Sequence, residues 1–566
     1  HTHQTCTEVR LPALTLENPQ LWSCESPQLY NAEVVVTADG MVVDSLTEQF
    51  GIRSLEFSPE FGFKLNGKKI FLQGNANHHD LGALGATCYD KAIERMMLQL
   101  KSFGYNCIRC SHNPYSDSFA RIADRVGILV VDELTDKWSD NDYWGGRQPF
   151  THIWHKLITE WIKRDRNRPS IILWSLGNEL QIREGWAGFE GTNDWGITTY
   201  NIFNQLVKRW DHTRLTTVAM FPARAGAITR HDKEFNDYLV PPELACATEV
   251  ASFNYQSDKY DAYLKYRPDL ILFQSEAETS NLLQPYYNMD KERMVGIAYW
   301  GSVEYWGESN KWPKKGWNYS FFEHTMRPYP QAYLIKTAFM PEIPEVHIGV
   351  VDAAGAESVS WNDVIVGRMA LNECWNHTPG SRRSLFTFTN AHSVELLVNG
   401  QSMGIQKNDT TRANLRNMIY WKDVPYGNGG SVVAIARDKS GKEVARHRIE
   451  TAGKAVALRI EAETPTDWKA DGMDLQYINV TVIDKKGRPV WDYNEPLTLQ
   501  MEGAARLVAL DNGDHYTDEL FHGITSKRMY QGRMQIILRS DQEAGNVTVK
   551  ISSAGLKGTL RLKTIK

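Results

Sequence analysis

The chain has 566 residues, of which 42% are hydrophobic and 23% charged, a globular composition too long for a single hydrophobic core. Its 63 basic and 68 acidic residues give a net charge of −5, and the absence of a basic run argues against nucleic acid or an anionic membrane as the main partner. No apolar segment reaches the roughly 18 residues that cross a bilayer, so we expect three or four domains and no membrane span.

The start of the chain and its cysteines say little about its compartment. The chain begins at His1 without a signal-like segment, so we expect a fragment or a processed form. Its start leaves the compartment unknown, and we expect a periplasmic or secreted protein rather than a cytoplasmic one. The seven cysteines have no framework spacing. Cys107 and Cys110 lie in one strand-like stretch, where they would face opposite sides, which argues against a redox or zinc role.

Residues 1–60 are predicted to form strands. Two β-rich runs meet at Ala38-Asp39-Gly40, a hairpin signal. These strands are too few for a complete sandwich, so we expect the C-terminal part of an immunoglobulin-like β-sandwich whose front is missing.

Residues 61–342 alternate short apolar strands with amphipathic helices. The predicted strands are 70–74, 107–111, 128–132, 171–176, 215–220, 250–254, 270–274 and 294–300. The clearest helices between them are 91–103, 116–126, 153–164 and 197–210. Eight such repeats predict a catalytic (β/α)₈ barrel. The alternative, a doubly wound open sheet, would call for a Gly-rich phosphate loop after the first strand, and QGNANHH is not one.

The helical signal ends near residue 342. Alternating apolar and polar residues, with turns such as Val398-Asn399-Gly400-Gln401, predict an immunoglobulin-like β-sandwich over 343–451 and a second C-terminal sandwich over 452–566. These sandwiches either bind polysaccharide or pack on the barrel, and we favour packing. The fold class is therefore multidomain, with a (β/α)₈ TIM barrel flanked by immunoglobulin-like β-sandwich domains.

Two predicted barrel strands end in a glutamate. The stretch IILWSLGNE carries Asn178 and Glu179 at the end of the fourth strand, and DLILFQSE carries Glu276 at the end of the seventh. Barrel strands present catalytic groups at this end. Two carboxylates across a glycosidic bond can divide the work of hydrolysis, one attacking the anomeric carbon and the other protonating the leaving oxygen. The alternative is that one of them is a capping or buried ion-pair residue.

Other polar and aromatic groups follow the same strand ends, and a whole ring of them is hard to explain as structure alone. They are Asn77, His78, His79, Asp80, Arg109, His112, Asn113, Asp132, Glu133, Tyr255, Gln256, Trp300, Glu304 and Trp306.

Three stretches together resemble glycoside hydrolase family 2, the family of β-galactosidases, β-glucuronidases and β-mannosidases. They are RDRNRPSIILWSLGNE, GYNCIRCSHNPYSDSFARIADRVGILVVDE and ILFQSEAE, and the resemblance extends to the lead-in FGIRSLEFSPEFGFKLNGKKIFLQGN. It implies that Glu179 is the general acid/base and Glu276 the nucleophile. In such a cycle the charge of the nucleophile helps to keep the nearby acid protonated until the glycosyl-enzyme forms.

The resemblance also implies the residues that contact substrate or support the nucleophile. They are His78, Arg109, His112, Asn178, Tyr255 and Trp300. Among them, Arg109 is implied to position the nucleophile, His112 to hold sugar hydroxyls and Asn178 to bond the 2-hydroxyl.

Three departures from the family pattern limit these expectations. The family resemblance implies a jelly-roll sugar-binding domain ahead of the immunoglobulin-like one, and we expect that the residues of this chain do not include it. In DELTDKWSD, Lys137 and Ser139 stand near the metal-ligand positions of the lac-type enzymes, so we predict no metal and no cofactor. In NKWPKKG, Pro313 stands where glucuronidases carry an Asn that holds the sugar carboxylate. The polar residues close by are Asn310, Lys311 and Lys314.

The expected activity is that of an exo-acting, retaining β-glycosidase, with β-galactosidase first and β-glucuronidase or β-mannosidase as alternatives. The expected substrate is an oligosaccharide or a β-glycoside derived from polysaccharide, and a homo-oligomer stays open. The alternative from another class is a non-catalytic carbohydrate-binding protein on a barrel scaffold. The loops at 139–148 and 181–193, on which the leaving-group side depends, carry no readable pattern.

Overall fold

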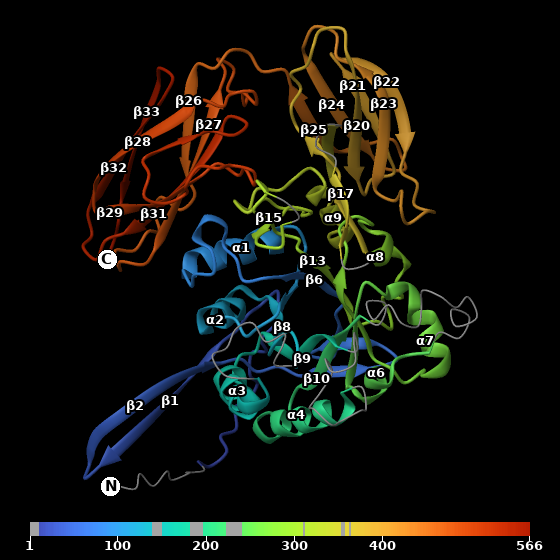
Figure 1. Ribbon diagram of the computed structural model, residues 1–566, viewed down its shortest axis with the longest axis vertical. Helices are drawn as coiled ribbons and strands as arrows, with labels where there is room; N and C mark the ends of the chain where they lie inside the picture. Colours follow the sequence, from blue (N-terminus) through green and yellow to red (C-terminus); the bar gives the residue numbers. More distant parts are fainter. Residues whose placement is uncertain are drawn as a thin grey trace.

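The centre of the molecule is a closed barrel of eight parallel strands (Figure 1). The computed structural model describes residues 11–138, 150–180, 196–221, 240–309, 312–352, 357–361 and 364–566. The barrel strands are β6 (Leu72–Asn77), β7 (Cys107–Cys110), β8 (Leu129–Glu133), β9 (Ile171–Leu180), β10 (Leu215–Met220), β11 (Val250–Asn254), β12 (Leu272–Ala277) and β13 (Gly296–Trp300). They follow one another around the ring in sequence order, and β13 closes it by pairing with β6. The predicted TIM barrel is confirmed.

Helices cover the outside of the barrel where the sequence alternates strand and helix. They are η1 (Gly82–Leu84), α1 (Asp90–Ser102), α2 (Asp117–Val126), α3 (Phe150–Asp165), α4 (Ile197–Trp210), α6 (Glu243–Ala247), η4 (Ser257–Lys259), α7 (Tyr260–Tyr266), α8 (Gln284–Asn288) and α9 (Ala332–Phe339). The start of α2 is fixed by the Ser116 hydroxyl, which accepts a hydrogen bond from the Phe119 amide, and its end by Gly127 in the left-handed conformation.

Successive residues of each barrel strand face the interior and the helices in turn. In β7, Cys107 lies in the inner cluster with Leu72 and Leu129, whereas Ile108 and Cys110 pack among the helices. The two cysteines therefore point apart, as predicted. Arg109 lies between them and faces the barrel interior, where it reaches the acidic side chains described below.

Two all-β units follow the barrel and lie at the end of the molecule away from the β1–β2 hairpin (Figure 1). The first has a sheet in the order β19-β16-β20-β23 and another in the order β22-β21-β24-β25, with the pair β17-β18 beside them. Its strands are β16 (Val346–Val351), β17 (Glu357–Trp361), β18 (Val364–Arg368), β19 (Leu371–Asn372), β20 (Arg382–Thr389), β21 (Ser393–Val398), β22 (Gln401–Lys407), β23 (Met418–Pro425), β24 (Ser431–Arg437) and β25 (Glu443–Glu450).

The second unit has the sheets β26-β27-β31-β29 and β30-β28-β32-β33. Its strands are β26 (Ala457–Ala462), β27 (Leu475–Ile483), β28 (Pro496–Gly503), β29 (Ala505–Asp511), β30 (Ser526–Arg528), β31 (Arg533–Ser540), β32 (Asn546–Ser553) and β33 (Leu556–Lys563). This unit packs on the barrel, because Leu84 and Ala92 share an apolar cluster with Tyr477 and Ile537. Beside that cluster, Arg95 makes two hydrogen bonds of 2.7 and 2.9 Å to a carboxylate of the sandwich.

Short strands precede the barrel and interrupt its last loop. They are β1 (Tyr30–Ala38), β2 (Met41–Phe50), β3 (Leu55–Ser58), β4 (Gly62–Leu65), β5 (Lys68–Lys69), β14 (Tyr305–Trp306) and β15 (Gly316–Trp317). The predicted hairpin at residues 38–40 joins β1 and β2. Trp22, Phe63 and Leu65 cover the inner cluster of the barrel at the end opposite to the site. The domain boundaries at 60, 342 and 451 stay predictions. Within the described ranges, no helix combines the length and the apolar character needed to cross a membrane.

Candidate active site

The eight predicted site residues all lie at the carboxyl ends of the barrel strands. Arg109, Asn178, Glu179, Glu276 and Trp300 lie within the strands. His78 and Tyr255 are the first residues after their strands, and His112 is the second after β7. Hydrogen bonds and ring contacts connect them into one group. Glu179 and Glu276 lie at the carboxyl ends of β9 and β12, and the roles expected of them stay predictions.

Glu276 is held by two donors on opposite oxygens. Arg109 donates from Nη1 to Oε1 at 2.7 Å, and the Tyr255 hydroxyl donates to Oε2 at 2.6 Å. Burial and the neighbouring charge of Glu276 raise the pKa of Tyr255 well above its usual value, so the phenol keeps its proton and remains a donor. The carboxylate is 3% exposed, and its two oxygens are therefore fixed in direction.

Arg109 is itself clamped by a second, fully buried carboxylate. Its Nε and Nη2 atoms donate to Glu133 Oε2 at 3.0 and 2.8 Å, and Nη2 also reaches the Asn178 carbonyl at 2.9 Å. Burial lowers the pKa of Arg109, but the charges of Glu133 and Glu276 raise it by more. The net pKa lies above its usual value, so the guanidinium stays charged. One positive group is thus shared between two negative ones.

His112 is held in one orientation by the same carboxylate. Its Nδ1 atom lies 2.6 Å from Glu133 Oε1, and its Nε2 atom lies 3.2 Å from the Asn178 amide nitrogen. A proton on Nδ1 satisfies both contacts, since Nε2 then accepts from the amide. The ring lies parallel to Trp300, with centroids 5.3 Å apart. The two parallel rings therefore lie beside the polar groups of Glu133 and Asn178.

Asn178 connects the two halves of the site. Its amide nitrogen donates to Asp136 at 3.0 Å, and its backbone N–H donates to the Asp136 carbonyl at 2.7 Å. Lys137 contacts the same carboxylate at 2.6 Å. Burial raises the pKa of Asp136, but the nearby His112 and Lys137 lower it more, so the acid is ionised.

Glu179 is the next-to-last residue of β9, beside Asn178, and has a left-handed backbone conformation with φ of 49°. The Asn254 amide lies 3.5 Å from Glu179 Oε1 and donates to the Asn178 side chain at 3.0 Å. The Ser275 hydroxyl, one residue before Glu276, donates to the carbonyl of Asn254 at 2.7 Å. Asn254 therefore links the ends of the two strands that carry the glutamates.

His78 follows the first barrel strand, and its ring contacts those of Trp300 and His112. Its ring meets Trp300 edge-on at 5.1 Å, its Nδ1 atom lies 3.1 Å from the Ser111 carbonyl, and its Nε2 atom lies 3.6 Å from Glu308. Burial lowers the pKa of His78, but the nearby Glu308 raises it more, and the net pKa lies above its usual 6.5.

Replacing Glu308 by Gln is expected to lower the pKa of His78, because Glu308 is the largest of the influences that oppose the effect of burial. In the wild type, the stabilising contribution of His78 is complete below pH 6.5 and is lost as the pH rises through the raised pKa. The test is an NMR titration of the ¹⁵N-labelled histidines, with His78→Gln to assign the signal. An unchanged titration in the Glu308 variant would contradict this electrostatic account.

Several residues of the site were not among the predicted contacts. They are Glu133, Asp136, Asn254, Tyr305 and Glu308. The position of Glu133 at the end of the third barrel strand marked it in the sequence as a candidate. Its partners Arg109 and His112 belong to another strand end, so its contacts could not be predicted. The loops at 139–148 and 181–193, and the residues Ser139, Asn310 and Lys311, lie outside the described residues. Lys314 is buried, with its ammonium 4.0 Å from the ring centre of Tyr319.

Two groups of side chains of metal-ligating type occur among the described residues, and neither includes a predicted site residue. They are Glu304 with His324 and His515, and His347 with Glu373 and His447.

Sequence comparison matches most of the chain to models of one family. The family descriptions are "Glycosyl hydrolases family 2" at residues 1–53, its "TIM barrel domain" at 60–291, and "Glycoside hydrolase family 2 C-terminal domain 5" at 458–560. A domain of unknown function matches residues 380–445.

Relatives and solved structures named as glycosidases or as members of this family are similar to nearly the whole chain. A β-galactosidase of Bacteroides ovatus is 27% identical over 96% of this chain and 67% of its own length. A putative β-glucuronidase of Formosa agariphila is 42% identical over 100% of this chain and 55% of its own length. The crystal structure of a glycosyl hydrolase family 2 member from Bacteroides cellulosilyticus is 30% identical, with a TM-score of 0.81, over 96% of this chain and 68% of that one. The chain thus spans about half to two thirds of these relatives' lengths.

Proposed function

The chain belongs to glycoside hydrolase family 2, and on that premise we propose that it is an exo-acting, retaining β-glycosidase working by double displacement. The observation that carries the proposal is the Glu276 carboxylate, held by Arg109 and Tyr255 at 2.7 and 2.6 Å. These donors fix the direction of both carboxylate oxygens, as a nucleophile requires. A carbohydrate-binding protein without catalysis would have no need of this arrangement.

In the first step, a Glu276 oxygen attacks the anomeric carbon and the bond to the glycosidic oxygen breaks. Glu179 gives its proton to that oxygen, and the aglycone leaves as an alcohol. The hydroxyl of Tyr255 and the guanidinium of Arg109 keep the attacking carboxylate in place while one of its electron pairs forms the ester bond and its negative charge is lost. Asn178, fixed between Asp136 and Arg109, is positioned to bond the sugar 2-hydroxyl.

In the second step, Glu179 removes a proton from water, and the water oxygen attacks the same carbon from the side that the aglycone left. The bond to Glu276 breaks, its carboxylate charge returns, and the sugar is released with retained configuration. Every proton and electron pair is accounted for by the two glutamates and water.

For the sugar, we propose a β-galactoside first, and a β-glucuronide as the second candidate. The Bacteroides ovatus relative named a β-galactosidase supports the first. The relative named a putative β-glucuronidase and the buried ammonium of Lys314, at the last barrel loop, support the second, because a sugar carboxylate calls for a cation.

Hydrolysis of aryl β-galactoside, β-glucuronide and β-mannoside by the wild type, Glu276→Gln and Lys314→Ala tests the proposal. We expect galactoside turnover that Lys314→Ala leaves intact and Glu276→Gln abolishes. Glucuronide turnover that falls at least about tenfold in Lys314→Ala, which corresponds to about 1.4 kcal/mol, would favour the second candidate. Turnover of no sugar by folded protein would contradict the proposed enzyme and favour a binding protein.

A further inference from the structure

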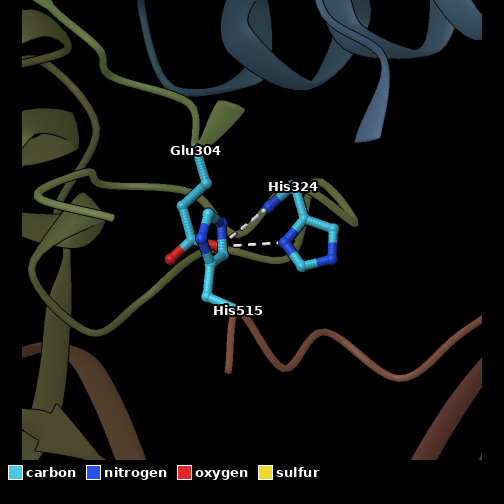
Figure 2. Close-up of side chains that lie close together, drawn as sticks. All are labelled: Glu304, His324 and His515. Carbon is cyan, nitrogen blue, oxygen red and sulfur yellow. Dashed lines mark hydrogen bonds and ion pairs between the residues drawn. The ribbon is translucent and has the colours of Figure 1, made fainter. Parts of the chain in front are cut away.

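A buried group of three ligating side chains lies where the barrel meets the last sandwich. Glu304 follows β13, His324 lies before α9, and His515 comes from the loop after β29 of the last sandwich (Figure 2). Their exposed fractions are 1%, 4% and 4%. None of them contacts the residues proposed for glycoside hydrolysis, so this group calls for an explanation of its own.

The three ligand atoms are spaced as a small tetrahedral cation would hold them. Glu304 Oε2 lies 3.1 Å from His324 Nδ1 and 3.0 Å from His515 Nε2, and all three atoms lie within 4.8 Å of one another. Ligands bound to Zn²⁺ at about 2.0–2.1 Å in a tetrahedron stand about 3.3 Å apart. Figure 2 shows both imidazoles turned toward the same carboxylate oxygen. Two imidazoles and one carboxylate are also the donors that zinc prefers.

The groups behind these ligands are those that support a bound metal. The other nitrogen of His324 lies 3.0 Å from Asp511, so a proton on Nε2 leaves Nδ1 free as a ligand. The Tyr329 hydroxyl donates to Glu304 Oε1 at 2.6 Å and fixes the orientation of the carboxylate. A carboxylate behind the histidine and a donor behind the glutamate are the usual outer partners of a metal site.

His515 gives a second, independent observation. Its Nε2 atom lies 3.0 Å from Glu304 Oε2, and its Nδ1 atom is buried with no hydrogen-bond partner among the described residues. A buried ring nitrogen without a partner is costly. A cation between the three side chains would take Nε2 as a ligand, and would balance the two buried carboxylates of Glu304 and Asp511.

Two of the three side chains border a cavity. A cavity of about 440 Å³ is lined by both Glu304 and His515, which leaves room for an entering ion and for a water as the fourth ligand. The guanidinium of Arg368 lies 3.5 Å from the Tyr329 hydroxyl and lines the same cavity. It opposes a second cation, so the site suits a single ion.

We propose that Glu304, His324 and His515 form a Zn²⁺ site that fastens the C-terminal sandwich to the barrel. Two ligands come from the barrel and one from the sandwich, so the ion joins two units that otherwise meet through apolar contacts and a few ion pairs. The site leaves one coordination position to water and lies outside the glycosidase centre.

The test is a titration of the full chain with Zn²⁺ after removal of metal by a chelator and dialysis. We expect one equivalent to be taken up in competition with a chromophoric chelator, and the thermal midpoint to rise with added zinc. Co²⁺ in place of zinc should give the intense visible absorption of a tetrahedral site. His515→Ala and Glu304→Gln should each weaken binding at least 100-fold and remove the thermal response.

Two further variants check that zinc binds at these three side chains and not elsewhere on the chain. Asp511→Asn keeps all three ligands and should weaken binding 10- to 100-fold, the usual effect of losing an outer partner. His447→Ala, in the second histidine group, should leave the stoichiometry unchanged, because His447 Nδ1 already accepts from the Ile348 amide and its Nε2 lies 4.0 Å from Glu373.

Failure of the wild type to take up zinc, or equal uptake by the wild type and His515→Ala, would overturn the proposal. In that case the three groups form a hydrogen-bonded ion pair that shares a proton. None of these readouts depends on glycoside hydrolysis, so the outcome is independent of the proposed activity.

Discussion

Replacing Glu276 by Gln is expected to lower kcat/KM for an activated aryl β-glycoside by at least about 10⁴-fold, the scale on which removal of a nucleophile acts. The amide has nearly the same shape and keeps an oxygen for Tyr255 or Arg109, but it cannot form the glycosyl ester. Initial rates measure the loss, and circular dichroism checks that the variant is folded.

Glu278→Gln is the matched control, since it removes a carboxylate two residues further along the same strand end and should retain most of the activity. A 2-fluoro glycoside with a good leaving group should accumulate the covalent intermediate in the wild type. Peptide mass analysis should then place the sugar on Glu276. A label on another acid, or near wild-type rates in Glu276→Gln, would be incompatible with the proposed nucleophile.

Replacing Glu179 by Gln is expected to separate the two proton transfers. With an alkyl glycoside, whose leaving group needs a proton, kcat/KM should fall by about 10²- to 10⁴-fold, the usual contribution of general acid catalysis. With a dinitrophenyl glycoside the first step needs no acid, so kcat/KM should fall far less, and hydrolysis of the intermediate should limit the rate. Steady-state rates on the two substrates measure this difference.

Azide provides the control for Glu179. As an anion it needs no general base, so it should accelerate turnover of the dinitrophenyl substrate by Glu179→Gln and give a β-glycosyl azide. The same azide should leave the wild type and Glu278→Gln without such acceleration. Equal losses on both substrates, without an effect of azide, would point to a positioning role for Glu179 instead.

The sequence predicted the barrel because its strands are short apolar runs separated by amphipathic helices. The predicted strands end too early where polar residues continue the hydrogen-bonded pairing of the barrel. The first strand was expected at 70–74, whereas β6 runs to Asn77, because Asn75 and Asn77 pair in register with β7. Similarly, β9 continues through Asn178 and Glu179 to Leu180, and β12 continues to Ala277. Hydrophobic pattern alone does not register a strand residue whose side chain is polar.

The predicted site residues came together because each had a recognisable place at a strand end. The supporting residues did not, because their role depends on distant partners. Glu133 is useful only where it meets Arg109 from β7 and His112, and Asn254 only where it bridges β9 and β12. His515 lies about 190 residues from its partner His324, and no pattern in either segment predicts that they meet. Such pairs follow from the closed fold, not from local sequence.

Arg109 shares its guanidinium between Glu276 and Glu133, and this has a consequence for the energy of the proposed cycle. When Glu276 becomes an ester its charge disappears, yet Glu133 still offers Arg109 a carboxylate at 2.8 Å. The guanidinium of Arg109 therefore keeps its position when the charge of Glu276 is lost in the first step and restored in the second. Because the donor groups keep their positions through both steps, the reorganisation energy of the reaction is small. The buried Glu133 remains the counter-ion of Arg109 throughout.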